Sequence, residues 1–323
     1  MKILKTLFAG LLGVLAAAGA AAQGGFPSRP ITMVVGFAPG GGTDTAARIV
    51  AKAASESLGQ SVVVENRAGA GGNIAHEHVA KAAPDGHTIL LGSVGPLTVA
   101  PHMIKNLPYD PLKDLVPVTM AVTFANVLVV HDGVPVRTLA DYIKLANDKP
   151  GTLTYGSSGI GGAGHLSGEL FRMMSKASIV HVPYKGGGPA MQDLLGKQIA
   201  SIFATPISAG PHIKAGKIRA IAVTSAQRTS FMPEVPTIAE SGFAGFEATN
   251  WYAYVLPAKT PIEIVDRWNR ELVKILNDPA VRKALLDQGM EPAPSTREQL
   301  AAYIKREYDT WARVVKEANI TAN

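Results

Sequence analysis

The sequence predicts an α/β protein made of two similar lobes that face one another across a cleft. Apolar segments typical of buried strands alternate with amphipathic helical segments, which favours sheets covered by helices. A unit of strand, glycine-rich loop, helix and strand occurs twice, over 31–65 and over 152–182. Two extended segments, 119–131 and 247–256, are suited to cross between lobes, and the 323 residues are ample for two cores.

The chain begins with the features of a secretory signal peptide. Lys2 and Lys5 precede an apolar run from Leu7 to Leu15, and small residues follow through Ala22. The apolar run is short for a membrane span and ends in small residues rather than charges. We therefore expect export, with residues 1–22 removed by cleavage near Ala22.

The first glycine-rich loop lies between a strand at 31–36 and a helix at about 45–58. Its residues, all candidates for ligand binding, are Phe37, Ala38, Pro39, Gly40, Gly41, Gly42, Thr43 and Asp44. Such a loop leaves backbone N–H groups free at the positive end of the helix, which suits an anion. No Gly-Lys-Ser/Thr follows, so this is not a Walker loop, and a carboxylate fits as well as a phosphate. The alternative is a glycine turn that only closes a tight corner.

The remainder of the first half adds two further candidates. The strand at 61–65 leads into a second small-residue loop that ends at Asn73, where a helix over 73–83 begins. A turn at 84–86 precedes a buried strand at 88–93, which ends at Ser93.

The second unit repeats the order of elements but not the residues. A strand at 152–155 leads into the glycine-rich loop 156–164, a helix at about 165–175 and a strand at 178–182. Its candidate ligand residues are Ser157, Ser158, Gly159, His165 and Tyr184. Ligands of open α/β sheets lie at the carboxyl ends of strands. Residues 37–43 should therefore face 157–159 across the cleft, with Ser93 and Thr205 at neighbouring strand ends.

The remaining pattern completes two lobes. We expect the first lobe to contain 23–122 plus 247–323 and the second to contain 123–246. The other expected elements are helices at 138–147, 188–195, 207–214, 262–276, 279–288 and 296–318, and strands at 199–204 and 217–223.

Composition excludes several classes of function. The chain has no cysteine, which removes disulfides, thiolate metal sites and cysteine nucleophiles. The net charge of +6 comes from scattered lysines and arginines, so we expect no nucleic-acid binding. The sequence His76-Glu77-His78 does not satisfy His-Glu-x-x-His, and we expect no metal site and no cofactor.

Two enzymatic readings fail on spacing. The stretch 159–164 fits Gly-x-Gly-x-x-Gly, but the acidic residue expected about 20 positions later is missing. The stretch 156–159 is not Gly-x-Ser-x-Gly, and no acid–histidine pair is evident downstream.

Some side chains allow two interpretations. His165 either donates a hydrogen bond in the pocket or satisfies local backbone, and Asp44 either complements the helix dipole or binds a ligand ammonium group. Trp251 and Tyr252 either pack between the lobes or border the ligand. We place the side chains that select the ligand near Phe37, Asn73, Tyr184, Thr205 and Trp251.

The motifs taken together resemble the periplasmic substrate-binding proteins of tripartite tricarboxylate transporters, the Bug-type solute receptors. The matching stretches cover nearly the whole chain after the signal peptide: 35–44, 65–73, 84–86, 155–159, 182–186, 213–220 and 234–240. Two positions depart from the family pattern, Ala38 where a second proline is common and His87 where an aromatic residue is common.

The resemblance implies a two-lobe periplasmic-binding-protein (Venus-flytrap) fold, type II-like, with the ligand cleft between lobes. It also implies that main-chain groups and ordered waters around the glycine loops hold a ligand carboxylate. We therefore expect a monomeric, non-catalytic periplasmic receptor that delivers a small organic or aromatic acid to integral-membrane permease subunits. The alternative is an exported enzyme such as a hydrolase acting on a small acidic substrate.

Overall fold

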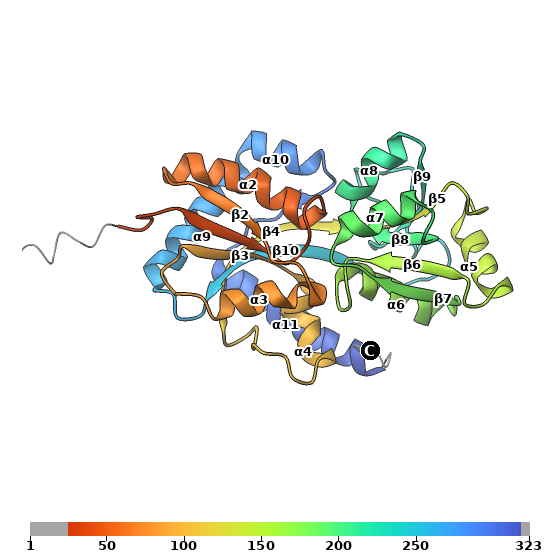
Figure 1. The fold of residues 1–323 in the computed structure, drawn as a ribbon, viewed down its shortest axis with the longest axis horizontal. Coiled ribbons are helices and arrows are strands. Elements are labelled where there is room, and N and C mark those ends of the chain that lie inside the picture. The colour runs from red at the N-terminus through yellow and green to blue at the C-terminus, as the bar shows by residue number, and fades with distance from the viewer. Residues whose placement is uncertain (1–24, 318–323) are drawn as a thin grey trace, which may run out of the picture.

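The computed structural model describes residues 25–317, which form two lobes that each contain one sheet covered by helices (Figure 1). The predicted signal peptide and its cleavage site near Ala22 lie outside the described residues. Within the described part of the chain, no helix is long and apolar enough to cross a membrane.

The first lobe is built on a six-stranded sheet with the order β11-β4-β10-β3-β1-β2. Strand β1 runs parallel to β2 and β3, and β10 runs antiparallel to β3 and β4. Its strands are β1 (Ile31–Val35), β2 (Val62–Asn66), β3 (Thr88–Ser93), β4 (Leu115–Ala125), β10 (Thr249–Pro257) and β11 (Glu291–Pro292).

The second lobe is built on a five-stranded sheet with the order β7-β6-β8-β5-β9. Strand β6 runs parallel to β7 and β8, while β5 runs antiparallel to β8 and β9. Its strands are β5 (Val127–His131), β6 (Leu153–Ser157), β7 (Ile179–Pro183), β8 (Ser201–Ala204) and β9 (Ile218–Val223).

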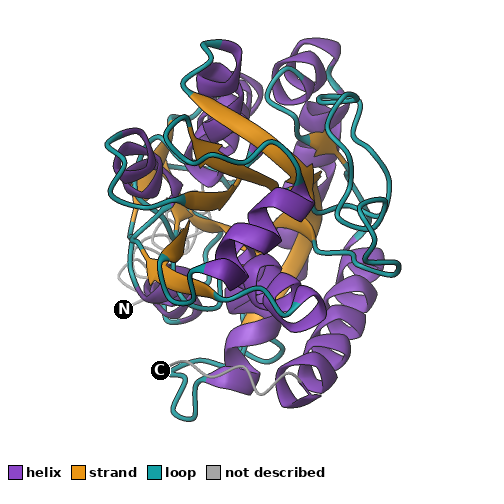
Figure 2. Ribbon diagram, turned by 90° about the vertical axis from the view of Figure 1, so that its right-hand side faces the viewer, coloured by secondary structure: helices purple, strands orange, loops and turns teal. Residues whose placement is uncertain are grey.

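Helices cover both faces of each sheet, and Figure 2 shows the layers from the second lobe. The helices and helical turns are α2 (Gly42–Leu58), η1 (Ala70–Gly72), α3 (Asn73–Ala80), η2 (Gly95–Val99), α4 (Ala100–Met103), α5 (Leu139–Asp148), α6 (Ala163–Ser175), α7 (Gly187–Leu195), α8 (Pro206–Lys214), α9 (Ile262–Asn277), α10 (Pro279–Leu286) and α11 (Arg297–Glu317).

Alternation along the strands explains why each sheet needs helices on both sides. In β1, Met33 packs with α2 and α9 on one face, whereas Val34 packs with α3 and α11 on the other. In the second lobe, α5 and α6 cover one face and α7 and α8 cover the opposite face. The two sheets thus have separate cores, which leaves the space between the lobes available for a site.

Two connections join the lobes, and they are hydrogen-bonded to one another. The chain leaves the first sheet at Ala125 and enters the second at Val127, with Asn126 between them. The Thr224 hydroxyl accepts the Asn126 N–H at 2.9 Å and donates to the Ala248 carbonyl at 3.0 Å. The two connections therefore behave as one hinge, which we define as Asn126, Thr224 and Ala248.

Most predicted elements are confirmed, and the differences concern helix starts, one long extended segment and a few short elements. Helices α2 and α6 begin at Gly42 and Ala163, a few residues before the expected starts at about 45 and 165. Helix α7 begins at Gly187, one residue before the expected start at 188. The predicted extended segment 119–131 is divided at Asn126 into β4 and β5. The short elements η2, α4 and β11 were not predicted, because each is too brief to show a hydrophobic period.

Candidate ligand site between the lobes

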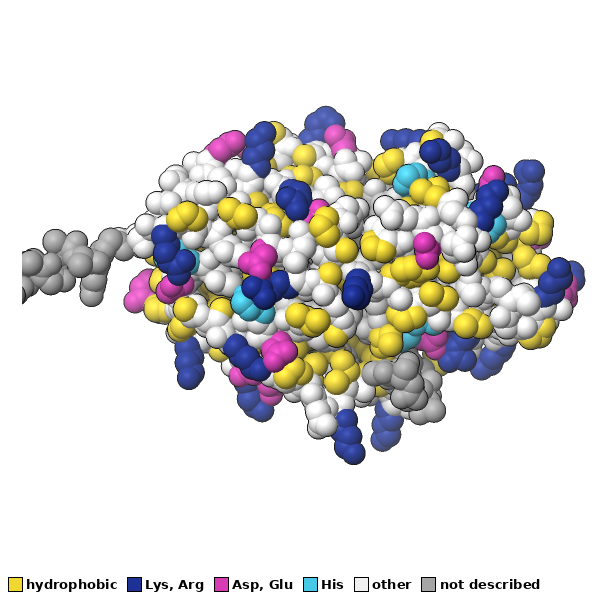
Figure 3. All heavy atoms as spheres, in the orientation of Figure 1, with side chains coloured by type: hydrophobic (Ala, Val, Ile, Leu, Met, Phe, Trp, Pro, Cys, Tyr) yellow, Lys and Arg dark blue, Asp and Glu magenta, His cyan; other side chains and the backbone are white. Residues whose placement is uncertain are grey.

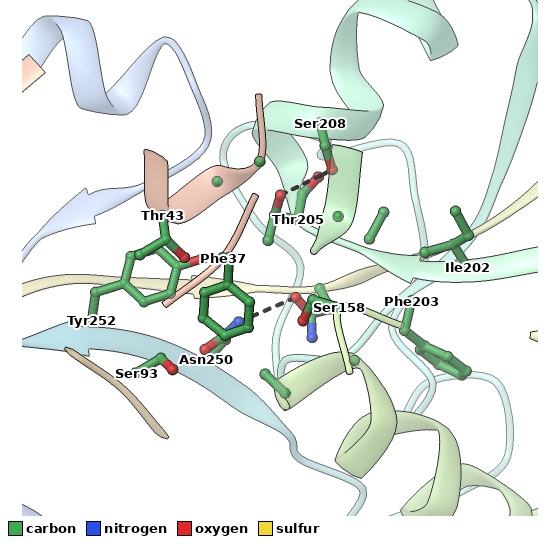
Figure 4. A pocket seen from close by; sticks show the side chains of 17 residues that line it. Phe37, Thr43, Ser93, Ser158, Ile202, Phe203, Thr205, Ser208, Asn250 and Tyr252 are labelled. Carbon is green, nitrogen blue, oxygen red and sulfur yellow. Dashed lines mark hydrogen bonds between the residues drawn. The ribbon is translucent and has the colours of Figure 1, made fainter. Parts of the chain in front are cut away.

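A small cavity lies between the lobes at the ends of strands β3, β6 and β8. The centres of water-sized groups can occupy about 40 Å³ of it, which makes room for a small guest (Figure 4). Both lobes contribute to its wall. The lining residues are Phe37, Gly41, Gly42, Thr43, Ser93, Asn126, Ser158, Ala163, Gly164, Gly187, Ile202, Phe203, Ala204, Thr205, Ser208, Asn250 and Tyr252.

Four helix N-termini meet at this cavity. Helix α2 comes from the first lobe, and α6, α7 and α8 come from the second. The first residues of α2, α6 and α7 line the wall, and α8 reaches it through its N-cap Thr205 and through Ser208. Their N-cap residues, Gly41, Gly162, Gly186 and Thr205, accept no backbone N–H with a side chain. Pro206 of α8 has no N–H, and the Ser208 N–H donates to the Thr205 carbonyl. The N–H groups left for a guest therefore come mainly from the first turns of α2, α6 and α7, and the four helix dipoles make that guest an anion.

The polar side chains on the wall are neutral. Among the residues that the structure describes, none with a formal charge lines the cavity. Burial raises the pKa of Tyr252, an effect that the Thr43 hydroxyl partly opposes, so the phenol stays protonated and can donate. Apolar side chains, including Phe37, Ile202 and Phe203, complete the wall and limit access of water.

Ser93 has an unused hydroxyl group on this wall. The residue is only 5 % exposed, and its Oγ atom is buried without a hydrogen-bond partner. A buried hydroxyl without a partner is energetically unfavourable, so a partner from outside the chain would satisfy it.

The structure brings seven of the predicted site residues onto the cavity wall: Phe37, Gly41, Gly42, Thr43, Ser93, Ser158 and Thr205. The other nine predicted residues lie off the wall: Ala38, Pro39, Gly40, Asp44, Asn73, Ser157, Gly159, His165 and Tyr184. Most of the nine hold the loops in place instead.

Asp44 is fully occupied by neighbours in its own lobe. Its carboxylate accepts hydrogen bonds from the Gly40 N–H, from Arg48 Nε and from Asn66 Nδ2. Burial alone would raise the pKa of Asp44, but the hydrogen bonds from Arg48, Asn66 and Gly40 outweigh burial and lower it. The carboxylate therefore anchors the first glycine loop, an arrangement that favours the structural interpretation over an ammonium site.

Ser157 and His165 shape the second glycine loop from behind. Ser157 Oγ lies 2.6 Å from His181 Nε2 and accepts the Gly159 N–H, while His165 Nδ1 accepts the Gly161 N–H. The rings of His165 and His181 stack with centroids 4.3 Å apart. Ser157 is fully buried behind the wall, so its hydroxyl is not placed to attack a molecule in the cavity.

Protonation of this pair should destabilise the fold. Burial lowers the pKa of His181 to about 3, helped by His165 and opposed by Glu169, and burial also lowers the pKa of His165. The unfolded chain titrates near 6.5, so unfolding takes up protons at lower pH. This stabilisation is complete above about pH 6.5 and is lost as the pH falls toward 3.

We therefore expect His181→Gln to flatten the pH dependence of stability by ~2 kcal/mol between pH 7 and pH 5. Urea unfolding at both pH values measures it, with His212→Gln as the control. Part of the slope should remain, because burial also lowers the pKa of His76 to about 4. A slope equal to that of the parent protein would contradict the assignment.

The remaining predicted residues have local roles. The Asn73 side chain donates to the Ala70 carbonyl and accepts the Tyr109 hydroxyl, and Tyr184 donates to Asp193. The Trp251 side chain is buried on the opposite face of β10, in the core with α11.

Sequence reasoning missed two asparagines on the wall. Asn126 lies on the first connection and Asn250 at the start of β10, just after the second connection, with Asn250 Nδ2 3.5 Å from Asn126 Oδ1. Each asparagine is a polar residue within a predicted extended crossing segment, and this pattern could have indicated a role at the site. For Tyr252, the sequence allowed either packing between the lobes or contact with the ligand, and the structure places it on the cavity wall.

Comparison with known proteins identifies the family. Residues 46–320 match the model of the tripartite tricarboxylate transporter family receptor. The chain belongs to this receptor family. It is similar to the protein BugT of Bordetella pertussis, with 40% identity over 293 residues that cover 90% of each chain.

Solved relatives share the fold. A Rhodopseudomonas palustris protein solved with adipate has a TM-score of 0.89 and 37% identity, covering 92% of this chain and 99% of its own. The R. palustris protein MatC, solved with bound malate, has a TM-score of 0.86 and 32% identity, covering 90% and 100%. The predicted two-lobe periplasmic-binding-protein fold is thus confirmed.

The family also defines what kind of protein this is. It is a periplasmic, non-enzymatic transport receptor, so the alternative of an exported hydrolase is set aside.

Proposed function

We propose that this receptor binds a small organic acid in the cavity between its lobes. The observation that carries the proposal is the convergence of four helix N-termini without side-chain caps on a cavity lined by neutral side chains. Such a site stabilises a negative charge through N–H groups and dipoles, without a counter-ion. Relatives solved with adipate and malate support a carboxylate as the anion.

The same wall argues against an amino acid as the ligand. A buried ammonium group requires a compensating negative charge, and among the described residues no carboxylate lines the wall. The carboxylate of Asp44 lies off the wall and is already bound by Arg48 and Asn66. The site as described therefore suits a carboxylate whose remaining groups are neutral or are further carboxylates.

Isothermal titration against mono- and dicarboxylates, with sulfate, phosphate and amino acids included, tests the ligand class. We expect carboxylates to bind and amino acids with a free ammonium group to be rejected. Binding of phosphate or sulfate in preference to every carboxylate would contradict the proposal. Mass spectrometry of acid released from the denatured protein would name the physiological ligand.

The Ser93 hydroxyl provides a sharper test. Ser93→Ala should weaken carboxylate binding by ~1 kcal/mol, about fivefold, because the ligand loses a hydrogen bond. Stability without ligand should not fall, because Ser93 Oγ has no partner in the protein to leave unpaired. Titration and thermal unfolding measure the two effects, with the exposed Ser230→Ala as the control. Loss of stability without loss of affinity would show that Ser93 serves the fold instead.

We further propose that the chain is exported, is cleaved near Ala22, acts as a monomer and delivers its ligand to integral-membrane permease subunits. The signal-like sequence of residues 1–22 and the transporter family support this role. On the face drawn in Figure 3, basic and acidic side chains are interspersed, which gives no support to a nucleic-acid partner. N-terminal sequencing of the periplasmic protein checks the cleavage site.

A further inference from the structure

The two lobes touch one another through glycines placed around the cavity. We call this set the glycine seam: Gly71 and Gly95 in the first lobe, and Gly159, Gly186 and Gly188 in the second. A Cβ atom on Gly71 would overlap the Ile160 carbonyl oxygen, and one on Gly95 would overlap the Gly161 carbonyl oxygen. On the other side, a Cβ on Gly186 would lie 2.9 Å from the Ala38 nitrogen.

These close approaches all join one lobe to the other. A Cβ on Gly159 would lie 2.9 Å from Gly71 Cα, and one on Gly188 would lie 3.0 Å from the Pro39 carbonyl oxygen. The Ala38 N–H also donates to the Lys185 carbonyl across the same boundary at 3.0 Å. Backbone therefore meets backbone, and the lobes close further than any side chains larger than hydrogen would allow.

The glycine seam borders the cavity in which we propose that the ligand binds. In the cavity behind it, about 40 Å³ is open to the centres of water-sized groups, and the buried Ser93 hydroxyl on its wall has no partner. With the seam in contact, a bound molecule must fit between the walls of this small cavity. A longer molecule must hold the lobes apart, which breaks the seam contacts and admits water to the polar wall.

We propose that the glycine seam sets how far the lobes close and thereby selects short acids over long ones. This inference rests on the proposed function, because it assumes a carboxylate ligand. Each seam glycine contributes by having no side chain, so adding a single methyl group should change the selectivity without altering any group on the cavity wall.

Gly95 is the position at which that methyl group can be added most cleanly. Its φ angle is not in the left-handed region, in contrast to Gly71 and Gly159 at +66° and +134°. The three atoms nearest to a Cβ on Gly95 all belong to Gly161 and Gly162 of the second lobe. Gly95 also begins the helical turn η2, where alanine is favoured over glycine. Gly95→Ala should therefore strain only the closed form.

The test is the affinity of the full mature chain for a series of linear dicarboxylates from malonate to pimelate. We expect the parent protein to prefer the short members. Gly95→Ala should lose at least tenfold in affinity for these and less than threefold for the longest members. Gly188→Ala should change selectivity in the same direction by a smaller factor, and Gly25→Ala, whose Cβ meets nothing within 4 Å, should change nothing. A uniform loss along the series, no loss, or a parent protein that prefers the longest acid would overturn the proposal.

A distance measurement separates this inference from the proposed function. The chain has no cysteine, so Lys113→Cys and Lys144→Cys, on different lobes with side chains 81% and 74% exposed, can carry spin labels without background. Gly95→Ala should reduce the population with the shortest label distance, with or without succinate. If no acid binds the parent protein but this shift occurs, the proposed function fails and the seam still limits closure. Identical distance distributions in the two proteins overturn the seam proposal.

Discussion

Replacing Ser158 by aspartate should abolish carboxylate binding, with Kd raised at least ~100-fold. Ser158 lies on the cavity wall beside the N-terminus of α6 (Figure 4). A second carboxylate about 4 Å from that of the ligand costs ~4 kcal/mol at an effective dielectric constant of about 20. The new carboxylate would also occupy the helix N–H groups that the ligand requires.

Ser158→Asn is the matched control, because it has a similar size and shape but no charge. It should lose less than ~1.5 kcal/mol of binding free energy, the value of about one hydrogen bond. Titration with a carboxylate that binds the parent protein measures both variants, and circular dichroism confirms that they fold. Equal losses in Ser158→Asp and Ser158→Asn would mean that charge at the helix N-termini does not control binding.

Thr224→Val should destabilise the protein by ~2–4 kcal/mol. The Thr224 side chain is fully buried at the hinge, where its hydroxyl accepts the Asn126 N–H and donates to the Ala248 carbonyl. Valine keeps the shape but leaves a buried donor and a buried acceptor unpaired, and each costs about 1–3 kcal/mol. Because the two backbone groups lie on different connections, the hinge loses this side-chain link, and only the bond from the Thr224 N–H to the Asn126 carbonyl remains.

Thr224→Ser keeps the hydroxyl group and loses one methyl group, so it should cost ~1 kcal/mol. Urea unfolding of both variants measures the difference. If Thr224→Val were no less stable than Thr224→Ser, the Thr224 hydroxyl would not contribute to holding the two connections together.

The fold was predictable because its signals are local and repeated. The strand–loop–helix units at 31–58 and 152–175 show both the hydrophobic period and the glycine punctuation of a strand-to-helix turn. The two crossings between lobes were also predictable, because each lies in a long extended segment of the sequence. The lobe boundaries were expected at 122/123 and 246/247. In the structure, β4 of the first lobe ends at Ala125 and β10 begins at Thr249.

The site was harder to predict, because whether a residue lines the cavity depends on where its side chain points and not only on its position along the chain. Thr43 and Asp44 are neighbours in α2, yet Thr43 lines the cavity and Asp44 binds Arg48 within the lobe. Trp251 and Tyr252 are neighbours in β10 and point to opposite faces. A glycine loop predicts that backbone N–H groups are present, but the side chains around it depend on how the lobes meet.

The helix N-termini are divided unequally between the lobes, and this division suggests the order in which the lobes bind the ligand. Three of the four N-termini, those of α6, α7 and α8, belong to the second lobe, and α2 alone belongs to the first. Under the proposed function, we expect an anion that reaches separated lobes to bind first to the second lobe, and α2 to complete its coordination on closure. On opening, the anion would lose one helix N-terminus and keep three. We therefore expect the ligand to stay bound to the second lobe after opening, until another protein or solvent displaces it.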